Sequence, residues 1–251
     1  MSTVCLIGGG WTPAAWPLTL GPFVMAAHRA GATRIAVVLH GEPGDPRGEM
    51  EVRFAHAFEA AGLAASQLRF VWVGDKTPLT FEILEEIKAT AVFVGGGLTP
   101  AYHAALCQDM GWLDEIRQLG LAYGGFSAGA AIAANHAILG GWQVLRHGKP
   151  VPMVHPDMGE DLDLLTVLPG LGLVPFAVDV HAGQWGTVSR LMQAVDTGAV
   201  GEGWAIDEDT ALIVEQGHVR VVGLGHAYHV AAGSGGALKV TLHPAVQGVL
   251  H

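Results

Sequence analysis

The sequence has few charged and few basic side chains, which narrows the possible partners. Charged residues make up 14% of the 251 positions, and 13 Lys and Arg stand against 23 Asp and Glu, for a formal net charge of −10. No run of Lys or Arg occurs. Because neutralising phosphates requires clustered basic side chains, nucleic acid is not expected as a partner.

Cysteine is also scarce. Cys5 and Cys107 both lie in apolar segments, which favours buried free thiols over a disulfide. His147, His155 and Asp157 could in principle meet, but neither an H-E-x-x-H motif nor paired Cys–His spacing is present. We therefore expect no metal and no other cofactor.

Long apolar runs are missing as well. No stretch of about 18 apolar residues is free of Gly, Pro and charge, so no membrane span is expected. Residues 1–4 contain no basic region ahead of the first apolar run, unlike a signal peptide. Together these features predict a cytoplasmic protein.

Apolar residues are plentiful at 50%, and the 36 glycines are scattered between apolar runs, as in tight turns. In the first 140 residues, strand-like runs alternate with helix-like stretches. The strands are expected at 4–7, 35–39, 69–73, 91–94 and 121–126, and the helices at 18–30, 49–61, 81–87 and 101–119. This alternation predicts an α/β fold, a three-layer α/β/α sandwich around a mainly parallel sheet.

The second half has a different pattern. It predicts a hairpin at 143–154, an acidic loop at 156–163, a short strand at 178–181, a helix at 187–195, an antiparallel pair at 205–214 and 219–224, and a strand at 237–242. We expect these antiparallel strands to extend the sheet. No linker or internal repeat is visible, so residues 1–251 are predicted to form a single domain.

One motif predicts a nucleophile. Residues 125–129 read Gly-Phe-Ser-Ala-Gly, which fits G-x-S-x-G, after an apolar strand and before an Ala-rich helix expected at 128–139. Such a sharp turn exposes the Ser127 hydroxyl at the strand end, beside the backbone N–H of Ala128 and the helix N-terminus. The alternative is an ordinary glycine-rich turn in which Ser127 caps the helix.

An oxyanion hole needs a second donor. Gly96 and Gly97, at the end of the preceding strand, are the best candidates, because bare backbone can approach a substrate carbonyl closely. The run Gly8–Gly10 is a weaker candidate, and Pro13 takes the place of the third glycine of a dinucleotide fingerprint.

A serine nucleophile also needs a base. Of the 13 histidines, His181 is the best placed, since it follows the strand-like segment 178–180 and precedes a helix. A structural role for any single histidine remains the more common case.

Five motifs in order carry a family resemblance: residues 93–97, 125–131, 171–175, 179–181 and 205–211. Together they resemble the peptidase E and cyanophycinase family of serine peptidases. The resemblance implies a class I glutamine-amidotransferase-like sandwich. It also implies a relay in which Ser127 is the nucleophile and His181 the general base.

The third member of the relay varies in the family. Glu208, 27 residues after His181, matches the acid position best, whereas residues 140–143 after the nucleophile contain no carboxylate. Its role would be to orient the imidazole and stabilise imidazolium. Without the resemblance, Glu208 reads as a surface turn carboxylate.

The same comparison bears on substrate. Of the basic residues that cyanophycinases carry near the histidine only Arg190 remains, and Leu98 follows Gly97 where a glutamine is usual. Cyanophycin is therefore not expected as a substrate, and Arg190 and Asp179 are the candidates for substrate contacts. Residues 143–165 look like an insertion that either roofs the site or forms an oligomer contact, which leaves a homodimer open.

We expect a serine peptidase acting on short peptides, as an exopeptidase or dipeptidase. The oxyanion would be held by the N–H groups of Gly96, Gly97 and Ala128. Two alternatives stay open: a non-catalytic binding protein on the same scaffold, and a small-molecule esterase or amidase.

Overall fold

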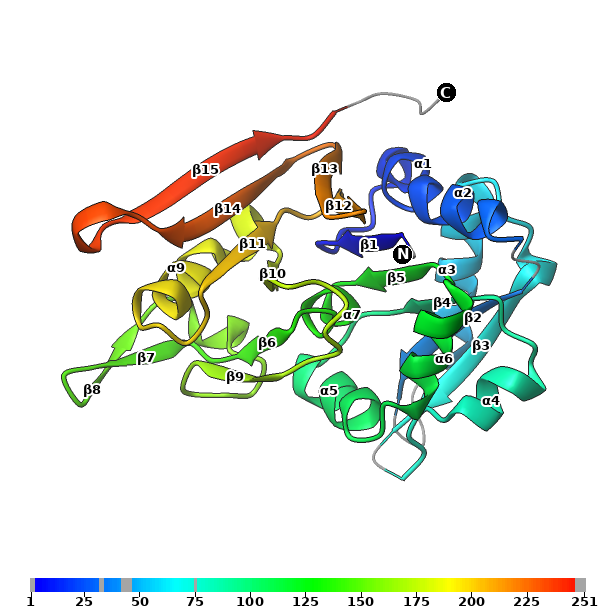
Figure 1. Ribbon diagram of the computed structural model, residues 1–251, viewed down its shortest axis with the longest axis horizontal. Helices are drawn as coiled ribbons and strands as arrows, with labels where there is room; N and C mark the ends of the chain where they lie inside the picture. Colours follow the sequence, from blue (N-terminus) through cyan, green and yellow to red (C-terminus); the bar gives the residue numbers. More distant parts are fainter. Residues whose placement is uncertain (1–2, 32–33, 42–46, 75, 247–251) are drawn as a thin grey trace.

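The computed structural model describes residues 3–31, 34–41, 47–74 and 76–246. Its centre is a seven-stranded sheet in the order β13-β12-β1-β5-β4-β2-β3 (Figure 1). The parallel part comprises β1 (Val4–Ile7), β5 (Tyr123–Phe126), β4 (Ala91–Val94), β2 (Ile35–His40) and β3 (Leu68–Val73). The antiparallel hairpin of β12 (Thr210–Glu215) and β13 (His218–Gly223) extends it beside β1, as expected.

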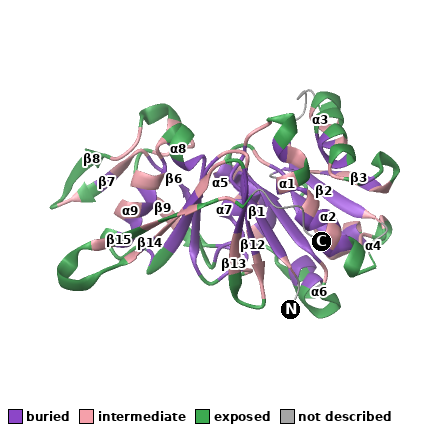
Figure 2. Cartoon of the chain, turned by 90° about the horizontal axis from the view of Figure 1, so that it is seen from above, coloured by how far each residue is buried: buried purple, intermediate pink, exposed green. Residues whose placement is uncertain are grey.

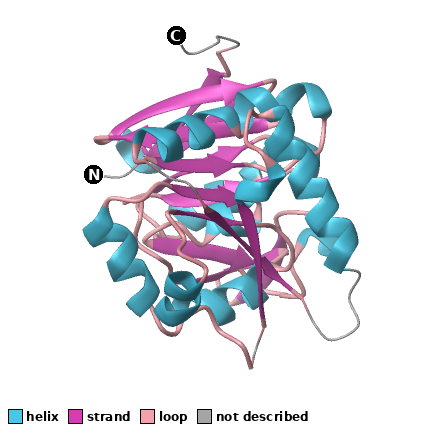
Figure 3. Ribbon diagram, turned by 90° about the vertical axis from the view of Figure 1, so that its right-hand side faces the viewer, coloured by secondary structure: helices cyan, strands magenta, loops and turns pink. Residues whose placement is uncertain are grey.

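Helices cover both faces of this sheet (Figure 3). Along β1, Val4 and Leu6 pack into one core layer and Cys5 and Ile7 into the other, which is the two-residue alternation of a strand buried on both sides. The first layer is closed by α4 (Phe81–Glu86), α5 (Thr99–Cys107), α6 (Gly111–Leu119) and α7 (Ala128–Ala131), and the second by α2 (Gly21–Arg29) and α3 (Arg47–Ala60), with α1 (Trp16–Thr19) before them. The α/β/α sandwich predicted from the sequence is confirmed.

A second sheet corrects one expectation. The strands β10 (Ala177–Val180), β11 (Glu202–Ile206), β14 (His226–Ala232) and β15 (Leu238–Pro244) form a separate four-stranded sheet, packed on α9 (Val188–Asp196). β10 and β11 are parallel, whereas β14 and β15 are antiparallel neighbours. The strand expected at 205–214 is therefore two strands in different sheets, β11 and β12.

The break between β11 and β12 has a local cause. The carboxylate of Asp207 accepts hydrogen bonds from the backbone N–H groups of Gly183 and His226, at 2.8 and 3.0 Å. The N–H of Asp209 donates to the carbonyl of Gly9 at 2.8 Å. These contacts turn the chain out of one sheet and into the other.

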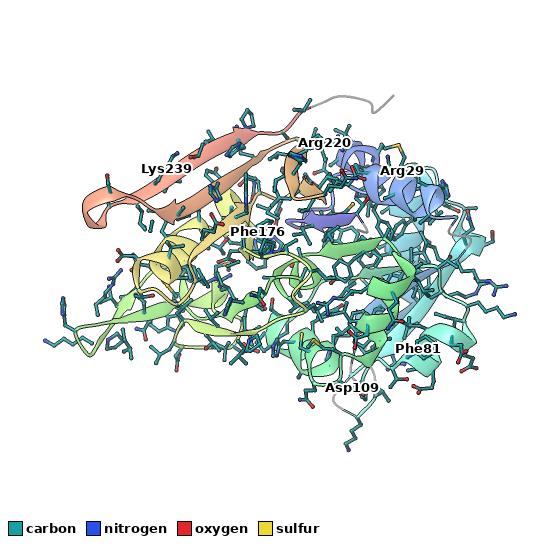
Figure 4. All side chains as sticks on the ribbon, in the orientation of Figure 1. Arg29, Phe81, Asp109, Phe176, Arg220 and Lys239 are labelled. Atoms are coloured by element: carbon teal, nitrogen blue, oxygen red, sulfur yellow. The ribbon has the colours of Figure 1, made fainter. Side chains whose placement is uncertain are left out.

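The two sheets share one hydrophobic core. Val178 and Ile206 of the second sheet pack in the same buried cluster as Leu6 and Val94 of the first. Phe176, labelled in Figure 4, lies inside the molecule near Trp204, with ring centroids 6.4 Å apart. The shared core holds the second sheet against the main sheet.

Two helix expectations were wrong. The helix expected at 128–139 ends at Ala131, because the backbone of Ala133 and Ala134 pairs with residues 172–174 instead of continuing the helix. The chain then forms β6 (His136–Gly140), which pairs with β9 (Thr166–Pro169). The helix expected at 101–119 is two helices, α5 and α6, separated where the Asp109 side chain accepts the N–H of Gly111.

The hairpin expected at 143–154 is present as β7 (Gln143–Arg146) and β8 (Lys149–Pro152), and it is largely exposed (Figure 2). Short 3-10 turns occupy Pro13–Ala15, Ala65–Gln67, Pro156–Met158 and Ser234–Gly236. None of the described helices has the length and apolar character needed to cross a membrane.

Candidate active site

Ser127 occupies the sharp turn between β5 and α7. Its backbone has φ 51° and ψ −110°, a conformation that side chains rarely adopt. A Cβ atom on Gly125 would lie 2.4 Å from the carbonyl oxygen of Gly129, and one on Gly129 would lie 2.3 Å from the carbonyl oxygen of Val94. Both glycines of the motif are therefore required by close backbone contact, and the turn presents the serine at the carboxyl edge of the sheet.

The second sheet brings the histidine and the carboxylate to this edge. Val180 and Ile206 are opposite each other in the parallel β10–β11 pair, so the residues that follow them emerge side by side. Ser127 Oγ lies 2.8 Å from His181 Nε2, and His181 Nδ1 lies 2.8 Å from Glu208 Oε1. The three side chains predicted from the sequence thus form one continuous hydrogen-bonded chain.

The protonation of this chain follows from its contacts. The carboxylate of Glu208 accepts the proton on Nδ1, which leaves Nε2 as the acceptor for the Ser127 hydroxyl. Burial lowers the pKa of His181, and the neighbouring Glu208 partly opposes that effect. The lowered pKa favours the neutral imidazole, which is the form that can accept a proton.

The glycine run after β1 holds His181 in place. The His181 N–H donates to the carbonyl of Gly8 at 3.0 Å, and a Cβ on Gly9 would lie 2.2 Å from the imidazole Cε1. A Cβ on Gly10 would lie 2.5 Å from the backbone nitrogen of Asp209, the residue after Glu208. These glycines were considered as oxyanion donors from the sequence, but they support the histidine and the carboxylate instead.

The predicted oxyanion donors lie next to Ser127. A Cβ on Gly96 would lie 2.8 Å from the Ser127 Cβ. The Tyr102 hydroxyl donates to the Gly96 carbonyl at 3.2 Å, and because the peptide is trans, the Gly97 N–H points away from Tyr102. Burial raises the pKa of Tyr102 to about 12, which keeps this donor protonated. Among the described residues, the N–H groups of Gly96, Gly97 and Ala128 donate to no backbone carbonyl.

A cavity of about 380 Å³ opens over the serine and histidine. Besides those two residues and Gly96 and Gly97, its wall contains Trp11, Met50, Leu98, Phe126, Asp157, Glu160, Asp161 and Trp185. Apart from His181, the ionisable side chains of this wall are three carboxylates, all from the acidic loop. That loop lies within residues 143–165, so this segment forms one side of the cavity.

The acidic loop is fixed to the catalytic scaffold. Glu160 Oε2 accepts the backbone N–H of Thr99 at 2.9 Å, two residues after Gly97. Arg190 Nη1 donates to the carbonyl of Met158 at 2.8 Å. Burial raises the pKa of Glu160, and the hydrogen bond from Thr99 partly opposes that effect. Glu160 is not among the site residues predicted from the sequence. The one local signal that points to it is the acidic composition of residues 156–163.

Arg190 and Asp179 are placed differently from the prediction. The Arg190 guanidinium donates to both carboxylate oxygens of Asp179, at 2.6 and 2.8 Å, and both residues are buried. Desolvation opposes the charge of Arg190, but the adjacent Asp179 raises its pKa above the ordinary value. Neither side chain lines the cavity, so their position gives them a structural role instead of the expected contact with substrate.

Among the described residues, no group of three or more His, Cys, Asp or Glu is arranged to hold a metal ion. His155 Nδ1 lies 3.4 Å from Asp157 Oδ2, and His147 lies at the end of the exposed hairpin. Asp157 also lines the cavity, whereas neither histidine does.

Fold and site together define a three-layer α/β protein with a serine–histidine–carboxylate constellation. The chain belongs to peptidase family S51, whose family model matches residues 47–222. The resemblance to the peptidase E and cyanophycinase family is thereby confirmed.

One similar sequence and one similar structure add to this comparison. A cyanophycinase from Geminocystis herdmanii (strain PCC 6308) is 31% identical over 164 residues, 62% of this chain and 53% of the relative. The match thus spans about half of that protein's length. The crystal structure of a peptidase from an acI-B1 Actinobacterium superposes with a TM-score of 0.68 over 99% of this chain and 96% of the other, at 19% identity. This likeness shows the fold, which is consistent with the class I glutamine-amidotransferase-like architecture.

Replacing Arg190 tests its structural role. We expect Arg190→Met to lower the free energy of unfolding by about 3–5 kcal/mol, because Asp179 is left buried without its partner. Denaturant unfolding measures this change. The double variant Arg190→Met/Asp179→Leu removes both charges and should recover most of the loss. If Arg190→Met left the free energy of unfolding unchanged and raised KM for peptide, Arg190 would instead contact substrate.

Proposed function

We propose that this protein is a serine peptidase that hydrolyses short peptides through Ser127, His181 and Glu208. The observation that carries the proposal is the unbroken chain of two 2.8 Å hydrogen bonds from the serine hydroxyl through the imidazole to the carboxylate. A helix cap or a surface carboxylate would not require either contact. Membership of family S51 supports the same chemistry.

In the proposed reaction, Ser127 Oγ attacks the carbonyl carbon of the scissile bond while its proton passes to His181 Nε2. Glu208 stabilises the imidazolium that forms. The imidazolium then gives the proton to the leaving amine, and an acyl-enzyme remains. Water, activated by the same imidazole, hydrolyses the ester and restores the serine.

The developing oxyanion would be held by the backbone N–H groups of Gly96, Gly97 and Ala128. Ala128 begins α7, so the helix N-terminus adds partial positive charge at that point. The Tyr102–Gly96 hydrogen bond fixes the peptide that carries the Gly97 donor before substrate arrives. Preorganised donors of this kind commonly contribute two to three orders of magnitude in rate.

The cavity supports a small substrate. About 380 Å³ accommodates a few residues, and the acidic loop closes one side. This favours an exopeptidase or dipeptidase over an enzyme that threads long chains.

The charge of the cavity favours a substrate with a positively charged group near the scissile bond. Asp157, Glu160 and Asp161 line the wall, and no described Lys or Arg does. Arg190 is paired with Asp179, and Arg53 lies over the Trp11 ring at 5.0 Å, outside the lining. A free α-amino group or a basic side chain fits these carboxylates. Cyanophycin, although the relative's name points to it, stays outside the proposal because the basic set that cyanophycinases carry near the histidine is reduced here to the buried, paired Arg190.

Ser127→Ala tests the nucleophile. We expect hydrolysis to fall at least about a thousandfold with unfolding unchanged, since one oxygen atom is removed from a folded turn. A fluorophosphonate probe should label the wild type and the exposed-serine control Ser66→Ala equally, but not Ser127→Ala. Failure to label the wild type would favour a non-catalytic binding protein. A wild type that is labelled but cleaves esters and no peptides would favour an esterase.

The pH profile tests the base. Because burial lowers the pKa of His181, the acid limb of kcat/KM should have its midpoint below the ordinary value of 6.5, with activity lost as pH falls through it. Glu208 raises that pKa, so Glu208→Gln should move the limb to still lower pH and reduce kcat. A limb that does not move in Glu208→Gln would contradict the assignment of the acid.

Matched peptides test the charge preference. We expect peptides with a Lys or Arg side chain beside the scissile bond to be cleaved about two- to five-fold better than neutral ones, and Asp peptides worse. The preference should shrink with salt and in Asp157→Asn/Asp161→Asn. Asp109→Asn, a loop carboxylate outside the cavity (Figure 4), is the control and should not change it. A preference for Asp peptides would refute the proposal and point to Arg53.

A further inference from the structure

One aromatic ring of the cavity is coupled to the proposed base. The indole of Trp185 stacks on the imidazole of His181, with ring centroids 3.8 Å apart and an angle of 12° between the planes. Trp185 is 37% exposed and lines the cavity, whereas His181 is 6% exposed. The indole therefore lies between the imidazole and the solvent of the site.

The position of Trp185 is set by a single helical turn. α8 (Ala182–Trp185, labelled in Figure 2) starts directly after His181, and the Trp185 N–H donates to the His181 carbonyl at 2.8 Å. Gly186 ends the turn with a left-handed backbone, φ 72°. The backbone of Trp185 is thus tied directly to that of His181.

The same turn also contacts the acid of the relay. The side-chain carbonyl of Gln184 accepts the backbone N–H of Glu208 at 2.9 Å. The N–H of Gly183 donates to Asp207, next to Glu208, at 2.8 Å. The turn that carries the indole is therefore fixed on the side of the histidine and on the side of the carboxylate.

We propose that Trp185 is a positioning residue that stabilises the imidazolium form of His181 through its π-face during proton transfer from Ser127. A cation above an indole is attracted by the ring quadrupole, and the attraction strengthens when water is excluded. Neutral imidazole gains far less from the same stack. The interaction therefore grows as the positive charge develops on the ring, which is the condition for accelerating the chemical step. This inference rests on the proposed function.

Other charges face His181 and bear on its pKa. Glu208 contacts Nδ1 from the β11–β12 turn, Asp179 lies on β10, and Arg190 on α9 faces it with the opposite sign. Across the cavity lie the three carboxylates of the acidic loop, Asp157, Glu160 and Asp161. None of these groups belongs to Trp185, so they remain in place when the indole is replaced.

The test compares Trp185→Phe with Trp185→Leu. The readout is the His181 pKa, measured by NMR titration in the resting protein on the signal that disappears in His181→Gln. We expect Trp185→Leu to lower that pKa by about half a unit to one unit, because the π-face is lost. Trp185→Phe keeps an aromatic face, so the His181 pKa should stay close to its wild-type value. Trp11→Leu removes an indole of the same cavity that packs on Phe54 and Phe126, and should not shift it.

Kinetics provide the second readout. In Trp185→Leu we expect kcat to fall about three- to ten-fold with a smaller change in KM, and the acid limb to move to lower pH. An unchanged or raised His181 pKa in Trp185→Leu would overturn the proposal, since an indole that only excludes water would lower the pKa and its loss would raise it. The titration needs no turnover, so it tests the role of Trp185 separately from the peptidase proposal. Failure of the peptidase proposal would be seen as a wild type that is unlabelled and inactive.

Discussion

The hydrogen bond from the His181 N–H to the Gly8 carbonyl joins the two halves of the site. Ser127 is presented by the main sheet, whereas His181 and Glu208 follow two parallel strands of the second sheet. The bond is possible because the chain after β1 consists of glycines, on which a Cβ would collide with His181 or with the turn that carries Glu208. Without this close approach the hydroxyl and the imidazole would have no fixed separation.

Small residues serve the same purpose around the serine. Gly125, Gly129 and Gly96 each have another backbone or side-chain group where a Cβ would stand. Backbone strain at Ser127 persists because these contacts leave the turn no other conformation. The site is thus built from backbone that side chains cannot cover, and this is the kind of surface from which N–H groups can reach a substrate carbonyl.

The charged groups around the site form two sets: a buried ion pair, and carboxylates on the cavity wall. The one arginine near His181 in the sequence motif is neutralised by Asp179 and helps to hold the acidic loop through Met158. The loop in turn contributes carboxylates to the cavity. Arg190, a candidate for substrate contacts from the sequence, therefore supports a wall of carboxylates instead. The proposed preference for a positively charged substrate rests on this wall.

The sequence by itself determined the parallel sheet and the sharp glycine turn at Ser127, because buried strands and tight glycine turns leave local patterns that do not depend on distant contacts. It marked His181 as the best-placed histidine, and the family resemblance pointed to it as the base. Glu208 followed from the family resemblance, since nothing local separates it from a surface carboxylate. Only the tertiary structure decided that 205–214 is shared between two sheets, that the helix after Ser127 stops at Ala131, and that Arg190 meets Asp179. It also decided that Glu160 and Trp185 reach the site. The split of 205–214, the end of the helix at Ala131 and the position of Glu160 depend on contacts between segments far apart in the chain, and such contacts outweigh local propensity. The contacts of Arg190 and Trp185 depend on side-chain directions that the residue pattern does not specify.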